Sequence, residues 1–238
     1  MIRLQFHYLL NRVSLGFLLL SAFALSACAV YASRFWEGMA WLDGSPVLGR
    51  EEYVRETIAV ARFVLVTTAL FLNIHCFWAG NSRFAAFFLS SSRDRLPFIV
   101  AKLGMIGLIL TGLCVHAWLS FVLTGFHLTP FFDWSMEEGV WFVSLWAETL
   151  VFGLIQALLM QGFDSVFSGI PPLLLFWWLE SNGSLPEDAK VSVIFRLIPH
   201  LVRTRTGFTQ GFEWSQIGIV IAGLSLLNLF IFRFRDVK

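Results

Sequence analysis

The sequence lacks the short motifs that mark most enzymes of known catalytic architecture. It contains no G-x-x-x-x-G-K-[S/T] phosphate-binding loop and no G-x-G-x-x-G dinucleotide-binding turn. It also contains no G-x-S-x-G nucleophile turn and no H-E-x-x-H zinc-binding helix. We therefore expect that the chain is not itself an enzyme, with no catalytic residue, no metal ligand and no cofactor of its own.

Charged residues are scarce as well. They make up 14% of the 238 residues, whereas soluble domains carry about a quarter. Hydrophobic residues make up 57%, and apolar windows near the length of a bilayer crossing recur along the chain. The net charge of +1 comes with no block of Lys and Arg, which argues against a nucleic-acid partner. The composition indicates an all-α, polytopic membrane protein, with a single transmembrane domain over residues 1–238.

Only three cysteines are present, Cys28, Cys76 and Cys114, and each lies in an apolar run. No pair has the spacing of a zinc site or a redox motif, so a disulfide framework is not expected. The letters LSAC, which end at Cys28, follow two arginines and an apolar run, as in a lipoprotein signal peptide. Five further apolar runs leave no mature soluble domain to anchor, so we interpret this run as a first membrane helix.

Six apolar runs are predicted to cross the membrane. They are Ser14–Ala32, Ile58–Ala79, Phe98–Thr124, Val140–Gln161, Ser165–Leu179 and Ile217–Phe232. The fifth is the shortest and contains Pro171 and Pro172, while a straight crossing needs about 20 residues. This span is therefore either broken or extends past Glu180. Because neighbouring helices must satisfy the backbone groups that proline frees, we expect it to pack inside a bundle.

The basic residues near the span ends predict the orientation. With the N-terminus in the cytoplasm, the inner segments hold Arg3, Arg12, Arg83, Arg93, Arg95, Lys102, Arg233, Arg235 and Lys238. The acidic residues concentrate in the outer segments, which include the predicted loop Ser33–Thr57. Basic density beside the spans sets orientation, so both termini are predicted to be cytoplasmic.

Several polar residues lie inside the predicted spans: Arg62, Asn73, His75, His116, Glu148, Gln156 and Asn228. At the rise of a helix, Glu148 and His116 lie about 12 Å below the outer surface and Arg62 about 6 Å below it. These three side chains could therefore meet as an intramembrane polar patch. One interpretation is a substrate path or a proton-sensitive pair. The other is a set of interhelical hydrogen bonds that fixes packing.

The connection from Gly80 to Pro97 is amphipathic and is predicted to form an interfacial helix. Its apolar anchors are Phe84, Phe87, Phe88 and Leu96, and its charged residues are Arg83, Arg93, Asp94 and Arg95. A basic cytoplasmic loop can simply lie on anionic lipid. It can also offer a charged and aromatic surface to a cytoplasmic partner.

The residues around this connection resemble the ABC-2-type transporter permeases. That family has a turn with Ser or Pro before Arg, then a hydrophobic pair and a lysine that open span three. Here the matching residues are Ser92, Arg93, Phe98, Ile99 and Lys102. The segment MIRLQFHYLLNR resembles the family's N-terminal interfacial helix, and VSVIFRLIPHLV stands where the family has short re-entrant outer helices. The letters GNSRFAAFF depart from the acidic residue and G-T-L that the family usually carries before the arginine turn.

The resemblance implies a function. The connecting helix would be a cytoplasmic coupling helix, with Arg83, Arg93 and Arg95 contacting a separate ABC ATPase subunit and Phe87 and Phe88 as packing anchors. ATP and Mg would bind to that partner, and a second permease copy or a homologous permease would complete the transporter. The substrate class would be hydrophobic or amphipathic, such as a peptide, an antibiotic or a lipid, and the direction would be export.

Two other interpretations remain open. The chain could be a non-transporting membrane anchor or assembly protein that recruits a cytoplasmic partner through its basic loop. Alternatively, EEYVRE at Glu51–Glu56 and FLNIH at Phe71–His75 resemble the motifs of intramembrane CAAX-type proteases. That hydrolase would require Glu51 and Glu52 together with His75 or His116, and the glutamate pair is predicted to lie in an outer loop.

Overall fold

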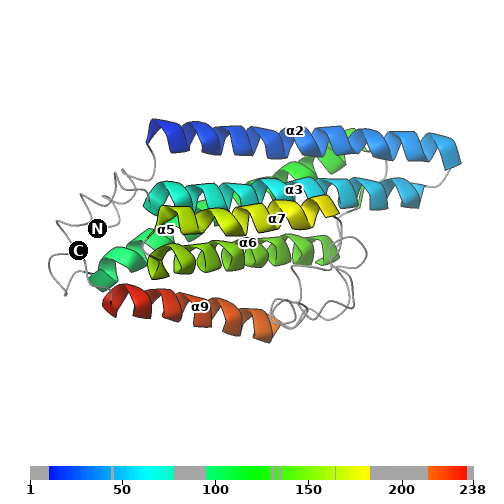
Figure 1. The fold of residues 1–238 in the computed structure, drawn as a ribbon. Helices are drawn as coiled ribbons and strands as arrows, with labels where there is room; N and C mark the ends of the chain where they lie inside the picture. The colour runs from blue at the N-terminus through cyan, green and yellow to red at the C-terminus, as the bar shows by residue number, and fades with distance from the viewer. Residues whose placement is uncertain are drawn as a thin grey trace. The chain divides into compact units, whose positions relative to one another are not determined.

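The structure, a computed structural model, describes residues 11–43, 46–77, 95–129, 132–133, 136–163, 165–182 and 214–234. Every element drawn in Figure 1 is a helix, and no strand occurs within these ranges. The prediction of an all-α fold is confirmed for this part of the chain. Residues 1–10 of the predicted N-terminal interfacial helix, residues 80–94 of the connection and the re-entrant segment before span six lie outside the described residues.

The helices, in chain order, are α2 (Arg12–Asp43), α3 (Pro46–Phe77), α5 (Arg95–Leu128), α6 (Met136–Gly162), the 3₁₀ turn η1 (Val166–Gly169), α7 (Ile170–Asn182) and α9 (Trp214–Phe234). Five helices contain windows that are long and apolar enough to cross a membrane. These windows are Arg12–Arg34, Tyr53–Phe77, Leu96–Leu128, Glu138–Gly162 and Ile217–Phe234. The chain is therefore a multi-pass membrane protein. A sixth crossing stays a prediction, because the remaining apolar helix, Val166–Trp178, is shorter.

The predicted outer loop Ser33–Thr57 is wrong for most of its length. Helix α2 continues to Asp43 and α3 already begins at Pro46, so that both helices have 32 residues. Hydropathy marks where apolar residues end, whereas a helix continues wherever its residues favour helical backbone, in water as well as in lipid. Proline at the first position of α3 is favoured because its missing N–H has no partner there in any helix. The glutamates at 51 and 52 consequently lie on α3, just before its apolar window.

Pro171 and Pro172 lie in the first turn of α7 and do not interrupt it. They are the second and third residues of a helix that runs to Asn182, within the first turn, where proline removes no intrahelical hydrogen bond. Among the described residues, one side of α7 is buried and another is exposed, so its packing inside a bundle stays a prediction. Phe176 is fully buried, whereas four apolar residues of α7 are exposed: Leu174, Leu175, Trp177 and Trp178.

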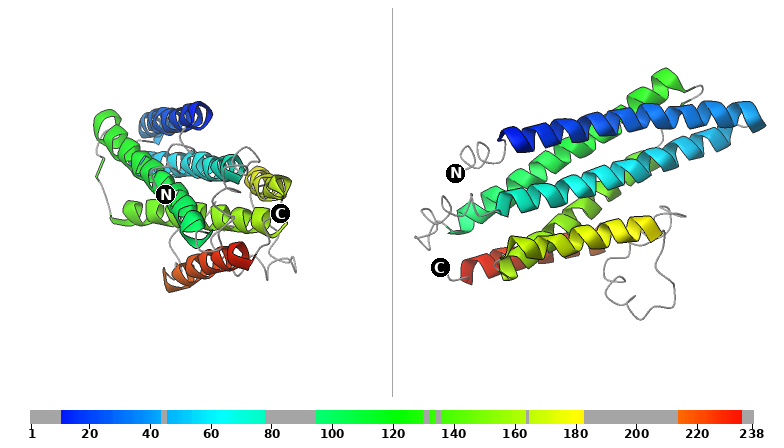
Figure 2. Two further views of the ribbon diagram at one scale, coloured as in Figure 1. Left: turned by 90° about the vertical axis from the view of Figure 1, so that its left-hand side faces the viewer. Right: turned by 45° about the horizontal axis from the view of Figure 1, so that its top comes forward.

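The chain forms two compact units, to both of which α3, α5 and α6 contribute. Unit 1 comprises residues 1–9, 69–106 and 150–238, and unit 2 comprises residues 10–68 and 107–149. In unit 1, α6 turns back through η1 into α7, and Figure 2 shows α7 alongside the second half of α6. Phe152 and Phe176 hold this hairpin together with an edge-to-face contact at 5.4 Å between ring centroids.

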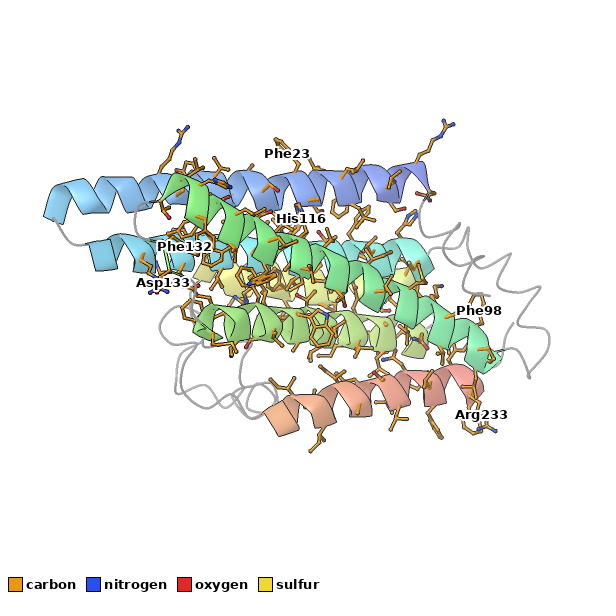
Figure 3. The ribbon with its side chains drawn as sticks, turned by 180° about the vertical axis from the view of Figure 1, so that it is seen from behind. Phe23, Phe98, His116, Phe132, Asp133 and Arg233 are labelled. Carbon is orange, nitrogen blue, oxygen red and sulfur yellow. The ribbon has the colours of Figure 1, made fainter. Side chains whose placement is uncertain are left out.

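An aromatic cluster fills one end of unit 2. The ring of Tyr53 is stacked on Phe121 at 5.0 Å, and the Tyr53 hydroxyl donates to the Phe121 carbonyl oxygen at 2.7 Å. Phe132, just beyond α5, contacts Phe121 and Phe126 edge to face. Figure 3 shows Phe132 and Asp133 at this end of α5. The cluster therefore joins the first turns of the apolar part of α3 to the last turns of α5.

Candidate functional site

Arg62 on α3 and Glu148 on α6 form a buried ion pair in unit 2. Arg62 Nε donates to both carboxylate oxygens of Glu148, at 2.9 and 3.0 Å, and Arg62 Nη2 donates to Oε1 at 2.6 Å. The two residues are only 4% and 8% exposed. This fork-to-carboxylate geometry is the strongest form of a charged hydrogen bond, and the pair carries no net charge. The structure thus brings together two of the three residues predicted for the polar patch.

The third residue of that patch, His116, bonds to α2. Its Nε2 lies 3.0 Å from Ser26 Oγ and 3.1 Å from the carbonyl oxygen of Ala22, and Ser26 Oγ lies 3.1 Å from Ser120 Oγ. Figure 3 shows His116 on α5 near α2, while Phe23 of α2 points away. A carbonyl oxygen can only accept, so Nε2 donates to Ala22 in the tautomer that carries a proton there. In the other tautomer, Nε2 accepts from the Ser26 hydroxyl.

The residues of the hydrolase interpretation are described only in part. His116 Nε2 lies within hydrogen-bond distance of Ser26 and Ala22, both on α2. His75 lies in the last turn of α3 and is stacked on Phe71 at 6.4 Å. The side chains of Glu51 and Glu52 lie outside the described residues. No group of three His, Cys, Asp or Glu residues within the described ranges could hold a metal ion.

A second charged pair, Arg50 and Glu138, was missed by the sequence analysis. Arg50 Nη2 donates to Glu138 Oε1 at 2.7 Å and to the carbonyl oxygen of Asp133 at 2.9 Å. Glu138 is 1% exposed, although it precedes the predicted fourth span. The position of Glu138 directly before an apolar run is the feature of the sequence that could have indicated a charged pair. That position does not identify Arg50 as the partner, because Arg50 lies far away in the sequence, in a segment predicted to be an outer loop.

Polar side chains in unit 1 join α6 to neighbouring elements by hydrogen bonds. Asn73 of α3 donates to the Gly153 carbonyl oxygen and Gln156 donates to the Gly169 carbonyl oxygen, both at 2.7 Å. Gln161 donates to Asn228 Oδ1 of α9 at 2.8 Å. Each contact joins α6 to a different element, so these amides act as interhelical hydrogen bonds, in agreement with the packing interpretation.

Asn228 is expected to be the main polar attachment of α9. Its Nδ2 donates to the carbonyl oxygens of Leu154 and Leu224, and it is fully buried, although only 6% of the α9 window is buried. Asn228→Ala should lower the free energy of unfolding by about 1–2 kcal/mol, because Gln161 loses its partner as well. Thermal unfolding in detergent, together with hydrogen exchange of α9, measures this. Ser225→Ala, at a half-buried position of the same helix, is the matched control, and an equal loss in both variants would contradict the assignment.

The residues predicted to couple to an ATPase are mostly outside the described ranges. This holds for Arg83, Phe87, Phe88 and Arg93, and for the side chain of Arg95, which is the first residue of α5. The residues that carry the family resemblance after the arginine turn are described. Phe98 and Ile99 are buried at 5% and 0% exposure, and Lys102 is 7% exposed.

Phe98 and Ile99 belong to an apolar cluster in unit 1, called here the anchor cluster. It consists of buried Phe98, Ile99 and Phe232, with Phe77, Leu103 and Leu229 packed against them. The rings of Phe98 and Phe232 are stacked at 6.3 Å. The cluster joins the last residue of α3, the first turns of α5 and the end of α9.

The functional assignment of this chain rests on its own residues, because comparisons with known proteins gave no match. No protein-family model matches the sequence, and no curated protein matches it.

Proposed function

We propose that this chain is the membrane-spanning permease subunit of an ATP-driven transporter of the ABC-2 type. The substrate would be hydrophobic or amphipathic, such as a peptide, an antibiotic or a lipid, and would be exported. ATP and Mg bind to a separate ATPase subunit, and a second permease copy or a homologous permease completes the assembly. The residues in which this chain resembles the family support the proposal, together with the multi-pass helical fold.

The anchor cluster is the observation that carries the proposal. Segment 78–94, which contains the proposed coupling residues, is tethered at one end to Phe77 and at the other to the first turn of α5. Both tethers belong to one packed cluster, which also includes Phe232 of α9. Packed cores move as bodies and do not deform continuously, so a push on the segment would displace the ends of three helices together. A coupling helix must be attached to the transmembrane helices in this way if its movement is to displace them.

The proposed orientation places this end of unit 1 on the cytoplasmic side. Arg95 begins α5 and Arg233 lies in the last turn of α9. In unit 2, Arg12 begins α2. Basic residues at span ends favour the cytoplasmic face, so the proposed location is a bacterial cytoplasmic membrane with both termini inside.

In this proposal the Arg62–Glu148 pair fixes the packing of α3 on α6. Its donors and acceptors meet each other at 2.6–3.0 Å, which leaves a neutral, well-bonded pair. His116, Ser26 and Ser120 likewise join α2 to α5. A role on the substrate path is the alternative, and the stability experiment in the Discussion separates the two.

The direct test is purification of the tagged chain from its native membrane under mild conditions, followed by mass spectrometry of bound proteins. A stoichiometric ATPase with a phosphate-binding loop is expected. Arg93→Glu should release it and uncouple ATP hydrolysis from transport, because the reversed charge repels an acidic docking surface. Arg93→Lys keeps the charge and should retain most of the bound ATPase.

Two further outcomes decide against the proposal. Normal transport by the Arg93→Glu protein would refute the docking role. Recovery of the chain without any ATPase in several mild detergents would favour the membrane anchor or assembly protein instead. Glu51→Ala and Glu52→Ala are expected to have mild effects, whereas complete loss of function in both would support the hydrolase.

A further inference from the structure

Lys102 is a buried cation in unit 1 with few partners. It is 7% exposed, and its ammonium lies 4.2 Å from the centre of the Phe77 ring and 5.7 Å from that of Phe98. Within the part of the chain that the structure describes, the ammonium has no hydrogen-bond acceptor and no carboxylate partner. Three N–H donors and a full charge are therefore held beside two aromatic rings and near the Cys76 thiol.

The two ring contacts do not balance the cost of this burial. A cation over an aromatic face gains less than an ammonium loses when it leaves water without hydrogen bonds, and this loss is larger in a membrane. An acceptor that carries negative charge would resolve the difference. The contacts around Lys102 are thus consistent with an anionic ligand.

The depth of Lys102 in the bilayer favours a lipid phosphate as that ligand. The apolar window of α5 has 33 residues, about 50 Å at the helical rise, whereas the hydrocarbon layer is about 30 Å thick. Even with a tilt of about 20°, roughly two turns at each end reach the headgroup region. Lys102 is seven residues from Arg95, or about 10 Å along the axis, and therefore lies near the phosphate level.

The direction of the side chain agrees with this depth. Phe98 is one turn before Lys102, so the approach of the ammonium to the Phe98 ring means that the side chain extends toward the N-terminus of α5. The first turn of an α-helix has backbone N–H groups without intrahelical partners, and such a terminus favours anions. Arg233, in the last turn of α9, is exposed and lies at the same end of unit 1 as Phe98 (Figure 3).

We infer that Lys102, framed by Phe77 and Phe98 at the N-terminus of α5, binds the headgroup phosphate of an anionic phospholipid in the adjoining leaflet. The phosphate oxygens accept from the ammonium and from the first N–H groups of α5. The acyl chains lie along the exposed apolar faces of the helices. The site requires no partner protein, so it does not depend on the proposed permease function.

Native mass spectrometry of the purified full-length chain tests this site. Wild-type protein should retain phosphatidylglycerol in preference to phosphatidylcholine. Lys102→Gln and Lys102→Met should each weaken phosphatidylglycerol binding by about tenfold or more, the loss of one charged hydrogen-bonding group. Lys102→Arg should retain most of the affinity. The two neutral variants differ in polarity, so a folding defect in one leaves the other informative.

Arg233→Gln is the matched control, because it removes the same charge from an exposed position at the same end of unit 1. It should leave phosphatidylglycerol binding near the wild-type value. An equal loss in Arg233→Gln, or unchanged binding in Lys102→Gln, would overturn the site. Displacement of the lipid by millimolar inorganic phosphate would show that the site takes a free phosphate and not a headgroup. None of these outcomes depends on an ATPase, so failure here leaves the permease proposal to its own test.

Discussion

Removal of either partner of the Arg62–Glu148 pair is expected to lower the free energy of unfolding by about 3–5 kcal/mol. Arg62→Met leaves the Glu148 carboxylate buried without its donor, and Glu148→Leu leaves the guanidinium buried without its acceptor. Both side chains are less than a tenth exposed, so water cannot replace the lost bonds without opening unit 2. The expected loss of stability therefore comes from the buried charge of the partner that remains.

The double variant Arg62→Met/Glu148→Leu should recover most of this loss. It buries two apolar side chains of similar size and leaves no unpaired charge, and such exchanges are often neutral or stabilising. Thermal unfolding of the four proteins in one detergent gives the coupling energy of the pair as a double-mutant cycle. Single variants that unfold like the wild type would contradict a buried, mutually dependent pair.

The Arg55–Glu56 contact supplies a matched control for this cycle. It lies on α3 in the same unit at 3.6 Å, but its side chains are 62% and 38% exposed. Replacement of Arg55 by Gln should change stability by less than about 1 kcal/mol, as for other surface pairs. Function separates the two interpretations of the buried pair. A stable double variant that still transports would identify a packing role, and a stable double variant without transport would place the pair on the substrate path.

Gly125→Ala is expected to destabilise the aromatic end of unit 2 by about 1–3 kcal/mol, the usual cost of overpacking. A Cβ atom at Gly125 would lie 2.6–2.8 Å from three ring carbons of Phe132. The Phe132 ring cannot move aside easily, because it is packed edge to face against Phe121 at 5.6 Å and Phe126 at 5.0 Å. The added methyl group must therefore shift either the ring or the end of α5.

The control for this variant lies on the same helix. Gly112 has no atom within 4 Å of the position of an added Cβ, so Gly112→Ala should be neutral or stabilising through its higher helix propensity. Thermal unfolding compares the two variants. In a Phe132→Leu background, the additional cost of Gly125→Ala should shrink, because the smaller side chain leaves room. An unchanged cost in that background would show that the ring is not the cause.

Sequence reasoning identified the elements that depend on local chemistry. Runs of apolar residues predicted the membrane helices, because transfer of a side chain into lipid depends on that residue and its near neighbours. Five of the six predicted spans coincide with helices whose apolar windows are long enough to cross. Pro171 and Pro172 were recognised as unusual, but hydropathy could not show that they lie in the first turn of α7 and leave its interior intact.

The partners of the buried polar residues depend on tertiary structure. The estimated depths of Arg62 and Glu148 differed by about one helical turn, and the reach of the arginine covered that difference. The estimated depth placed His116 at the same level as Glu148 and so allowed a contact between them. In the structure, His116 bonds to Ser26 and Ala22 of α2. The rotation of each helix about its axis decides which neighbour a side chain meets, and a hydropathy profile contains no information on that rotation.

The sequence by itself therefore determined that this is a multi-pass membrane protein with helical spans. Its shortage of charge and its long apolar windows favour a lipid environment, in which helices satisfy their own backbone groups. Tertiary structure decided the rest. It joined Arg50 to the buried Glu138, enclosed Lys102 between Phe77 and Phe98, and attached α9 through Asn228. These contacts join residues from separate helices, and their geometry follows from packing in three dimensions, which no local pattern of residues specifies.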